Sequence, residues 1–186
     1  MYASEPAGHR RAENIMDWVR RIAAAVEWTP LRLHISWDEI ERELGTRLPH
    51  DFKEFCETFG RGQFSEWLNV YSSAGGAEHV VVGKLAFLRS LGADLSELLE
   101  GYELFSSEQA GVIPWGSCEQ GSAYYWLANG DDPDRWPVMC LMETGGWARY
   151  EMTMSEFSYR LIADANFDIG YAREYYPPTF EPASLS

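Results

Sequence analysis

The stretch SWDEIERELGTRLPHDFKEFCETFGRG, residues 36–62, predicts two short amphipathic helices joined by a turn. Ser36 and Glu39 form the S-x-x-E pattern, in which each side chain satisfies a free backbone N–H at the start of a helix. Apolar side chains then recur at intervals of three and four residues, which places them on one face of each helix. Gly45 and Gly60 supply the flexible backbone that ends each helix. The stretch therefore predicts a helical hairpin that buries tryptophan and phenylalanine, with no catalytic constellation.

The rest of the chain predicts an α+β fold around this hairpin. Apolar residues spaced by four, three and four positions predict an amphipathic helix over residues 12–28. Helices are also predicted at 84–91, at 94–100 and after Thr153, whose spacing to Glu156 repeats the capping pattern. Aromatic segments bounded by turn residues predict strands at 64–71, 112–116, 122–128, 136–142 and 147–152, with a brief extended piece at 79–82. We therefore expect helices packed on one face of a mostly antiparallel sheet.

This reading divides the chain into three parts. Residues 1–30 form a polar lead and the amphipathic helix, and residues 31–175 form a single α+β domain. Residues 176–186 contain three prolines, and we expect them to form a loosely held tail.

The charge of the chain is large, negative and uneven. Its 186 residues carry a formal net charge of −14. Residues 1–63 contain 9 basic and 11 acidic side chains, a net charge of −2, whereas residues 64–186 contain 6 and 18, a net charge of −12. Such acidity disfavours nucleic acid and anionic membranes as partners and suits either solubility or contact with a basic partner.

The sequence also predicts a soluble protein of the cytoplasm. The opening residues MYASEPAGHRRAENI contain no apolar core of a signal peptide, and no apolar run approaches the length of a membrane span. Three scattered cysteines, Cys56, Cys118 and Cys140, are too few for a disulfide framework, so we expect reduced thiols.

Motifs that would carry catalysis or metal binding are not found. The four histidines lack the spacing of a zinc site, and the aspartates of DDPD at 131–134 suit a turn better than a calcium loop. Neither G-x-S-x-G nor a phosphate-binding G-x-x-x-x-G-K-[ST] occurs. A cysteine nucleophile with a histidine brought close by the fold stays open, as does an unspecified pair of carboxylates. We expect a non-enzymatic protein with no catalytic residues, no cofactor and no metal.

Several segments in order resemble one protein family. The pattern W-x-x-I-E-x-x-L-G-x-x-L-P-x-D-F-K-x-F-x-x-x-F-G-x-G at 37–62 is similar to the opening signature of the SUKH superfamily, the Smi/Knr-type proteins. The resemblance continues through IPWG at 113–116, G-x-x-x-Y-W at 121–126, D-x-D-x-W-P-V at 132–138 and E-F-x-x-x-L at 156–161. It covers roughly residues 36–165 and implies a SUKH-like domain. Its bacterial members include immunity proteins that neutralise a polymorphic toxin, often a nuclease, by stoichiometric binding.

An immunity protein of this kind would bind a basic toxin domain through acidic residues of the second half of the chain. The predicted partner-binding residues are Glu119, Asp131, Asp132, Asp134 and Glu143, with Trp136 or Trp147 as aromatic anchors, although a tryptophan is more often part of the core. Two other classes stay open. One is an adaptor or regulator of the cell-wall-signalling type, like the fungal members, and the other is an enzyme with an aromatic-lined cleft. The oligomeric state is open as well, with a monomer favoured.

Overall fold

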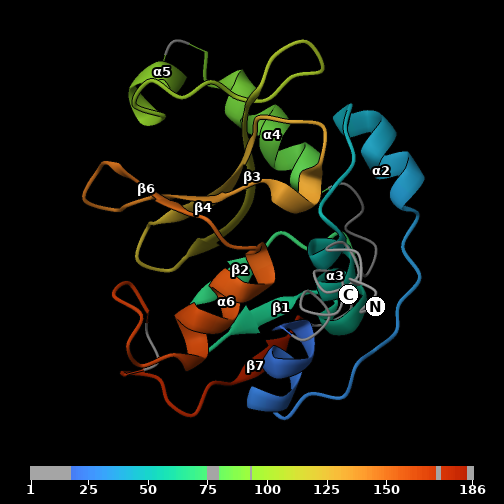
Figure 1. Ribbon diagram of the computed structural model, residues 1–186, viewed down its shortest axis with the longest axis vertical. Helices are drawn as coiled ribbons and strands as arrows, with labels where there is room; N and C mark the ends of the chain where they lie inside the picture. Colours follow the sequence, from blue (N-terminus) through green and yellow to red (C-terminus); the bar gives the residue numbers. More distant parts are fainter. Residues whose placement is uncertain (1–17, 75–79, 93, 171–172, 184–186) are drawn as a thin grey trace, which may run out of the picture.

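The computed structural model describes residues 18–74, 80–92, 94–170 and 173–183, and it shows helices packed on one antiparallel sheet (Figure 1). The seven strands are β1 (Gly62–Phe64), β2 (Leu68–Val70), β3 (Gly111–Cys118), β4 (Ala123–Ala128), β5 (Val138–Leu141), β6 (Trp147–Tyr150) and β7 (Phe180–Pro182). Their order across the sheet is β6-β5-β4-β3-β2-β1-β7. The helical elements are residues 18–25, α2 (Trp37–Leu44), α3 (His50–Phe59), α4 (Val80–Ser90), α5 (Asp94–Leu98), the 3₁₀ turn η1 (Pro133–Arg135) and α6 (Met154–Ala163). The predicted α+β class is confirmed.

The helical hairpin forms as α2 and α3, but its first helix does not begin with the predicted capping box. The Ser36 side chain makes no cap hydrogen bond, so that prediction was wrong. Glu41 stabilises the hairpin instead, because its Oε1 accepts from the Leu48 N–H at 2.9 Å and from Lys53 Nζ at 2.6 Å. Gly45 ends α2 in the left-handed conformation, as predicted, and Thr153 caps α6 by accepting from the Glu156 N–H.

One part of the core lies between the N-terminal helix, α3 and α6 and one face of the sheet, whereas α4 and the chain after α5 lie over the opposite face. Alternate strand residues point to the first of these faces, and phenylalanines of α3 and α6 pack against them. The Phe52 ring lies 5.0 Å from the Trp126 ring between centroids, and the Phe157 ring lies 5.3 Å from the Tyr124 ring. All four side chains are buried. The N-terminal helix adds Val19, Ile22 and Ala23 to the same core, so it belongs to the domain.

The opposite face of the sheet has two parts. Over β4–β6, Tyr125 is buried and its ring contacts Trp147, whose indole N–H donates to the Leu99 carbonyl at 2.9 Å. Tyr102 also packs on Trp147, so the chain after α5 covers this part. Over β7, β1 and β2, this face carries polar side chains that are half-buried or exposed. We call this second part the open face.

Three segment predictions were wrong. The strand predicted at 64–71 is a β1–β2 hairpin, because Ser65 and Glu66 turn the chain with φ of 51° and 54°. The extended piece predicted at 79–82 is the start of α4 from Val80 onward, and His79 lies outside the described residues.

The C-terminal tail also differs from its prediction, since residues 180–182 form the edge strand β7 beside β1. A side chain on Gly62 would lie 2.4 Å from the Glu181 carbonyl oxygen, so the absence of one lets the strands approach. Phe180 fastens β7 to the core by packing on Phe59 and Phe64. Residues 1–17 and 184–186, which include the predicted polar lead and the end of the tail, lie outside the described residues.

Candidate functional site

The open face carries a row of polar side chains from neighbouring strands. Glu181, Gln63, Asn69 and Ser117 lie opposite one another in register across β7, β1, β2 and β3. Glu119 extends this row, because its Oε1 accepts from Gln63 Nε2 at 2.8 Å and from Asn69 Nδ2 at 3.0 Å. Both donors are neutral amides, so these two bonds fix the carboxylate in position and leave its negative charge uncompensated.

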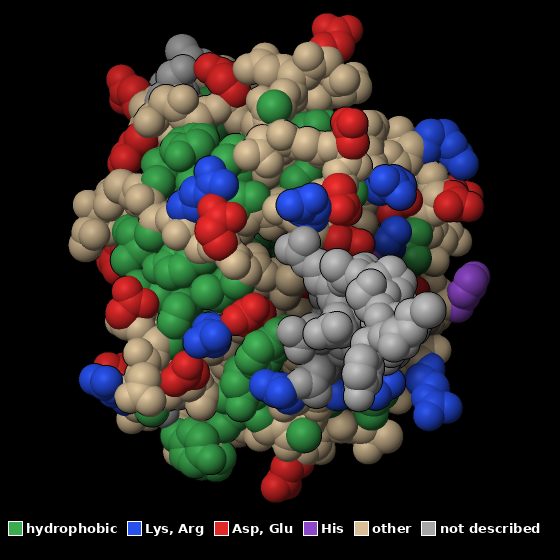
Figure 2. All heavy atoms as spheres, in the orientation of Figure 1, with side chains coloured by type: hydrophobic (Ala, Val, Ile, Leu, Met, Phe, Trp, Pro, Cys, Tyr) green, Lys and Arg blue, Asp and Glu red, His purple; other side chains and the backbone are tan. Residues whose placement is uncertain are grey.

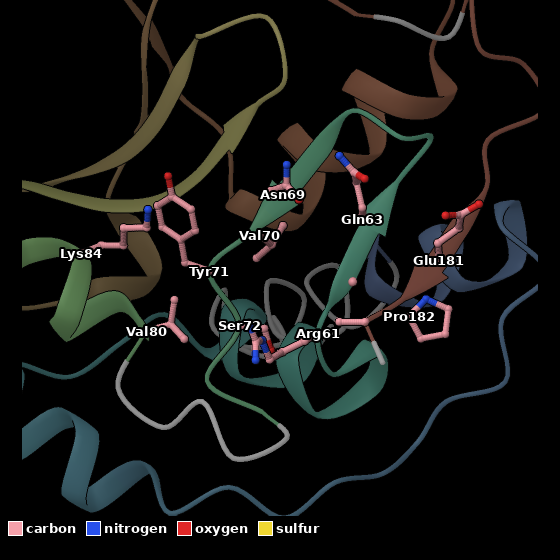
Figure 3. A pocket seen from close by; sticks show the side chains of 12 residues that line it. Arg61, Gln63, Asn69, Val70, Tyr71, Ser72, Val80, Lys84, Glu181 and Pro182 are labelled. Atoms are coloured by element: carbon pink, nitrogen blue, oxygen red, sulfur yellow. The ribbon is translucent and has the colours of Figure 1, made fainter. Parts of the chain in front are cut away.

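A hollow of about 480 Å³ lies beside this row (Figure 3). Lys84 of α4 places its ammonium 4.9 Å from the centroid of the Tyr71 ring, and Arg61 extends towards Ser72 (Figure 3). Glu181 and the amides Gln63 and Asn69 complete the lining, together with Gly62, Val70, Val80, Pro182 and Ala183. Cations and amides suit an anionic or amide group of a partner. The described lining residues include no histidine or cysteine, so they offer no activated thiol.

Three turns at one end of the sheet carry glutamates. They are the β1–β2 turn (residues 65–67), the β3–β4 turn (119–122) and the β5–β6 turn (142–146), and together we call them the hairpin edge. They contribute Glu66, Glu119 and Glu143 and contain no lysine or arginine. The turns follow one another along the sheet, since the Glu119 N–H donates to the Trp67 carbonyl and the Glu143 N–H donates to Ser122 Oγ.

The hairpin edge can be followed in Figures 1 and 2. In Figure 1 the β3–β4 and β5–β6 turns project to the left. Figure 2 shows several acidic side chains along that left edge. All three glutamates of the hairpin edge are exposed.

Two exposed tyrosines extend the hairpin edge. The chain before β7 passes the β1–β2 turn, where the Ser65 N–H donates to the Thr179 carbonyl at 2.9 Å. Ser65 and Thr179 line a hollow of about 280 Å³ together with Glu66, Tyr175 and Pro177. Tyr175 is 42% exposed and its neighbour Tyr176 is 72% exposed. No local sequence pattern points to Glu66 or the two tyrosines, because the pairing of β7 with β1 brings these distant segments together.

The predicted partner-binding residues do not form one cluster. Glu119 and Glu143 lie on the hairpin edge, whereas Asp131, Asp132, Asp134 and Trp136 lie in the β4–β5 connection at the opposite end of the sheet. Strand β4 has 6 residues and separates the two ends by roughly 20 Å at about 3.3 Å per residue.

Most residues of the β4–β5 connection stabilise the fold. Asp134 Oδ1 accepts from the His50 N–H at 2.6 Å at the start of α3, and Asp132 Oδ1 accepts from the Asp134 N–H at 3.2 Å. Trp136 is only 4% exposed, and its indole N–H donates to the Gly130 carbonyl. Trp136, which the sequence suggested as an aromatic anchor, therefore has its ring in the core. The alternative anchor Trp147 is half-buried against Tyr125.

Next to this connection, a buried carboxylate joins two helices. Asp51 of α3 is 2% exposed, and its Oδ2 accepts from the Ser155 N–H at 2.7 Å at the start of α6. Burial is the largest influence on this carboxyl and raises its pKa, with a smaller contribution in the same direction from Asp134. The Ser155 hydrogen bonds oppose the shift. Asp51 thus has a structural role.

The described residues give no geometric sign of a reactive thiol or a metal centre. Burial raises the pKa of the Cys56 thiol to about 12 and that of Cys140 also to about 12, so both are protonated at neutral pH. Within the described ranges, no three His, Cys, Asp or Glu side chains are grouped to hold a metal ion. No helix in that part of the chain has the length and apolar character needed to cross a membrane.

Comparisons of the chain with protein-family models, with curated proteins and with solved structures give no significant match.

Proposed function

We propose that this chain is a SUKH-like immunity protein that neutralises a cognate toxin domain by stoichiometric binding, without catalysis. The ordered sequence resemblance over residues 36–165 supports the assignment. In the fold, the first and last resembling segments are in direct contact. Asp51 belongs to the opening signature, and its bond to Ser155 joins that signature to α6, which carries E-F-x-x-x-L.

The observation that carries the proposed binding function is the placement of negative charge. Residues 64–186 hold a net charge of −12, and the hairpin edge presents three exposed glutamates with no cation in its turns. A nuclease toxin is basic where it meets nucleic acid. An acidic protein is attracted to that surface, and this attraction accelerates association. Once bound, the acidic protein competes with the nucleic acid for the same surface.

A growth-rescue assay tests this function. The C-terminal domain of the large open reading frame next to this gene is expressed in a bacterial host, with and without this chain. We expect the domain to arrest growth and this chain to restore it. Purified chain and domain should then form a 1:1 complex that weakens as salt increases. A toxic domain that is neither rescued nor bound would refute immunity and favour the adaptor class.

A further inference from the structure

We propose that the hairpin edge, together with Tyr175 and Tyr176, is the surface that docks a basic protein partner. The inference rests on the proposed binding function and names the face and the chemistry of the partner. The partner would present arginine and lysine side chains along a ridge, facing the glutamates, with arginines stacked on the tyrosines.

The charged groups of the hairpin edge lie along one line. Turns that join alternate strand pairs of the sheet are about 10 Å apart, so Glu66, Glu119 and Glu143 span roughly 20 Å. Glu143 lies against the β3–β4 turn, since its Cγ is 3.5 Å from the position of a Cβ on Gly121. Such a line fits within the roughly 800 Å² that each partner buries in an ordinary protein–protein interface.

The two exposed tyrosines have the chemistry of a binding surface. Five large hydrophobic side chains among the described residues are exposed, and two of them, Tyr175 at 42% and Tyr176 at 72%, are adjacent in the chain, with Tyr175 next to the β1–β2 turn. Tyrosine is enriched among the residues that dominate binding energy, because it offers a rigid apolar ring with a polar end. A basic partner adds arginine, which stacks on such rings.

The hairpin edge is held in position before a partner binds. Glu119 accepts from two amide side chains, so its carboxylate loses little freedom on pairing with a cation. Glu66 is held in a left-handed conformation, with a φ of 54°, that non-glycine residues rarely adopt. In the β4–β5 connection, by contrast, Asp132 and Asp134 accept from backbone N–H groups at the starts of η1 and α3, so they cap secondary structure.

The test maps a deca-arginine peptide on the full ¹⁵N-labelled chain by NMR titration. We expect shifted amides at residues 65–67, 119–122, 142–146 and 173–176. The double variant E119Q/E143Q should weaken peptide binding about tenfold at low salt. Y175A/Y176A leaves the net charge unchanged and should also weaken binding, because it removes the rings on which arginines stack. The matched control D131N/D132N also removes two exposed carboxylates, and its affinity should stay within twofold of that of the parent chain.

Three results would overturn the proposal. Amide shifts centred on residues 129–137 would place the acidic surface at the other end of the sheet. Equal weakening by E119Q/E143Q and D131N/D132N would show that only total charge matters. Line broadening of the hairpin edge with rising protein concentration, before peptide is added, would identify a second copy of this chain as the occupant. Growth rescue is scored separately, so failure of the immunity function is distinguishable from a wrong docking face.

Discussion

The two ends of the sheet look alike in sequence and differ in structure. Both carry acidic turns, at 131–134 and at the hairpin edge. At the first end, Asp134 accepts from the start of α3 and joins η1 to that helix, whereas Asp132 caps η1 itself. At the second end, Glu66 and Glu143 are exposed on turns. Acidic residues in a sequence therefore do not by themselves identify a binding face, because some of them accept hydrogen bonds that stabilise the fold.

The largest expected effect concerns Asp51, which joins α3 to α6 beside the β4–β5 connection. Asp51→Ala removes the acceptor of the buried Ser155 N–H and should lower the free energy of unfolding by about 1–3 kcal/mol. Urea denaturation at pH 7 measures this loss. The control is Glu143→Ala at the hairpin edge, which should change stability by less than about 0.5 kcal/mol. Similar losses for both variants would erase the difference between the two ends.

Removing the carboxylate at the start of α3 should have the next largest effect. Asp134→Ala deletes the acceptor of the His50 N–H and a negative charge at the N-terminus of the helix. We expect a loss of about 0.5–2 kcal/mol in thermal or urea unfolding. Asp131→Ala is the matched control, because the Asp131 side chain is exposed and only its backbone carbonyl is bonded, to Arg47. A loss as large in Asp131→Ala would contradict the structural role of Asp134.

The pH dependence of stability sharpens the same contrast. The pKa of Asp51 is raised in the folded state, so the folded chain binds this proton more tightly than the unfolded chain. Stability should therefore fall as pH rises from about 3.8 through the folded pKa and stay level above it. Asp51→Asn keeps an acceptor for Ser155 and has no charge to desolvate. This variant should remove the slope, and its free energy of unfolding at pH 7 should be within about 1 kcal/mol of that of the parent chain. An unchanged slope in urea unfolding from pH 4 to 8 would exclude Asp51 as its source.

The sequence predicts local structure well and long-range structure poorly, for physical reasons. The C-terminal end of α2 at Gly45 and the cap of α6 at Thr153 depend on residues within four positions, so their patterns were predicted correctly. The turn at Ser65 and Glu66 could not be predicted from the sequence, because turns with two left-handed residues favour glycine and asparagine. The strand β7 is three residues long and pairs with a distant partner, β1.

The candidate site follows the same rule. Glu119 and Glu143 were predicted as partner-binding residues and lie together on the hairpin edge, where the prediction remains to be tested. The structural use of Asp134 depends on a hydrogen bond to His50 across 84 positions. No local sequence pattern predicts such a contact. Tyr175 comes to the edge only because β7 pairs with β1.

The smallest expected effect separates stability from binding at the hairpin edge itself. Glu66→Gly places glycine at a φ of 54°, where it is unstrained, and should raise the free energy of unfolding by up to about 1 kcal/mol. The same change removes one of the three aligned charges and should weaken the deca-arginine peptide. Glu66→Asn is the matched variant, since asparagine tolerates this conformation and is neutral. Its affinity for the deca-arginine peptide should fall as much as that of Glu66→Gly, and its free energy of unfolding should rise less. A chain that became more stable and less able to bind would show that the strained glutamate is retained for contact with a partner, whereas a destabilised Glu66→Gly would place Glu66 among the structural carboxylates.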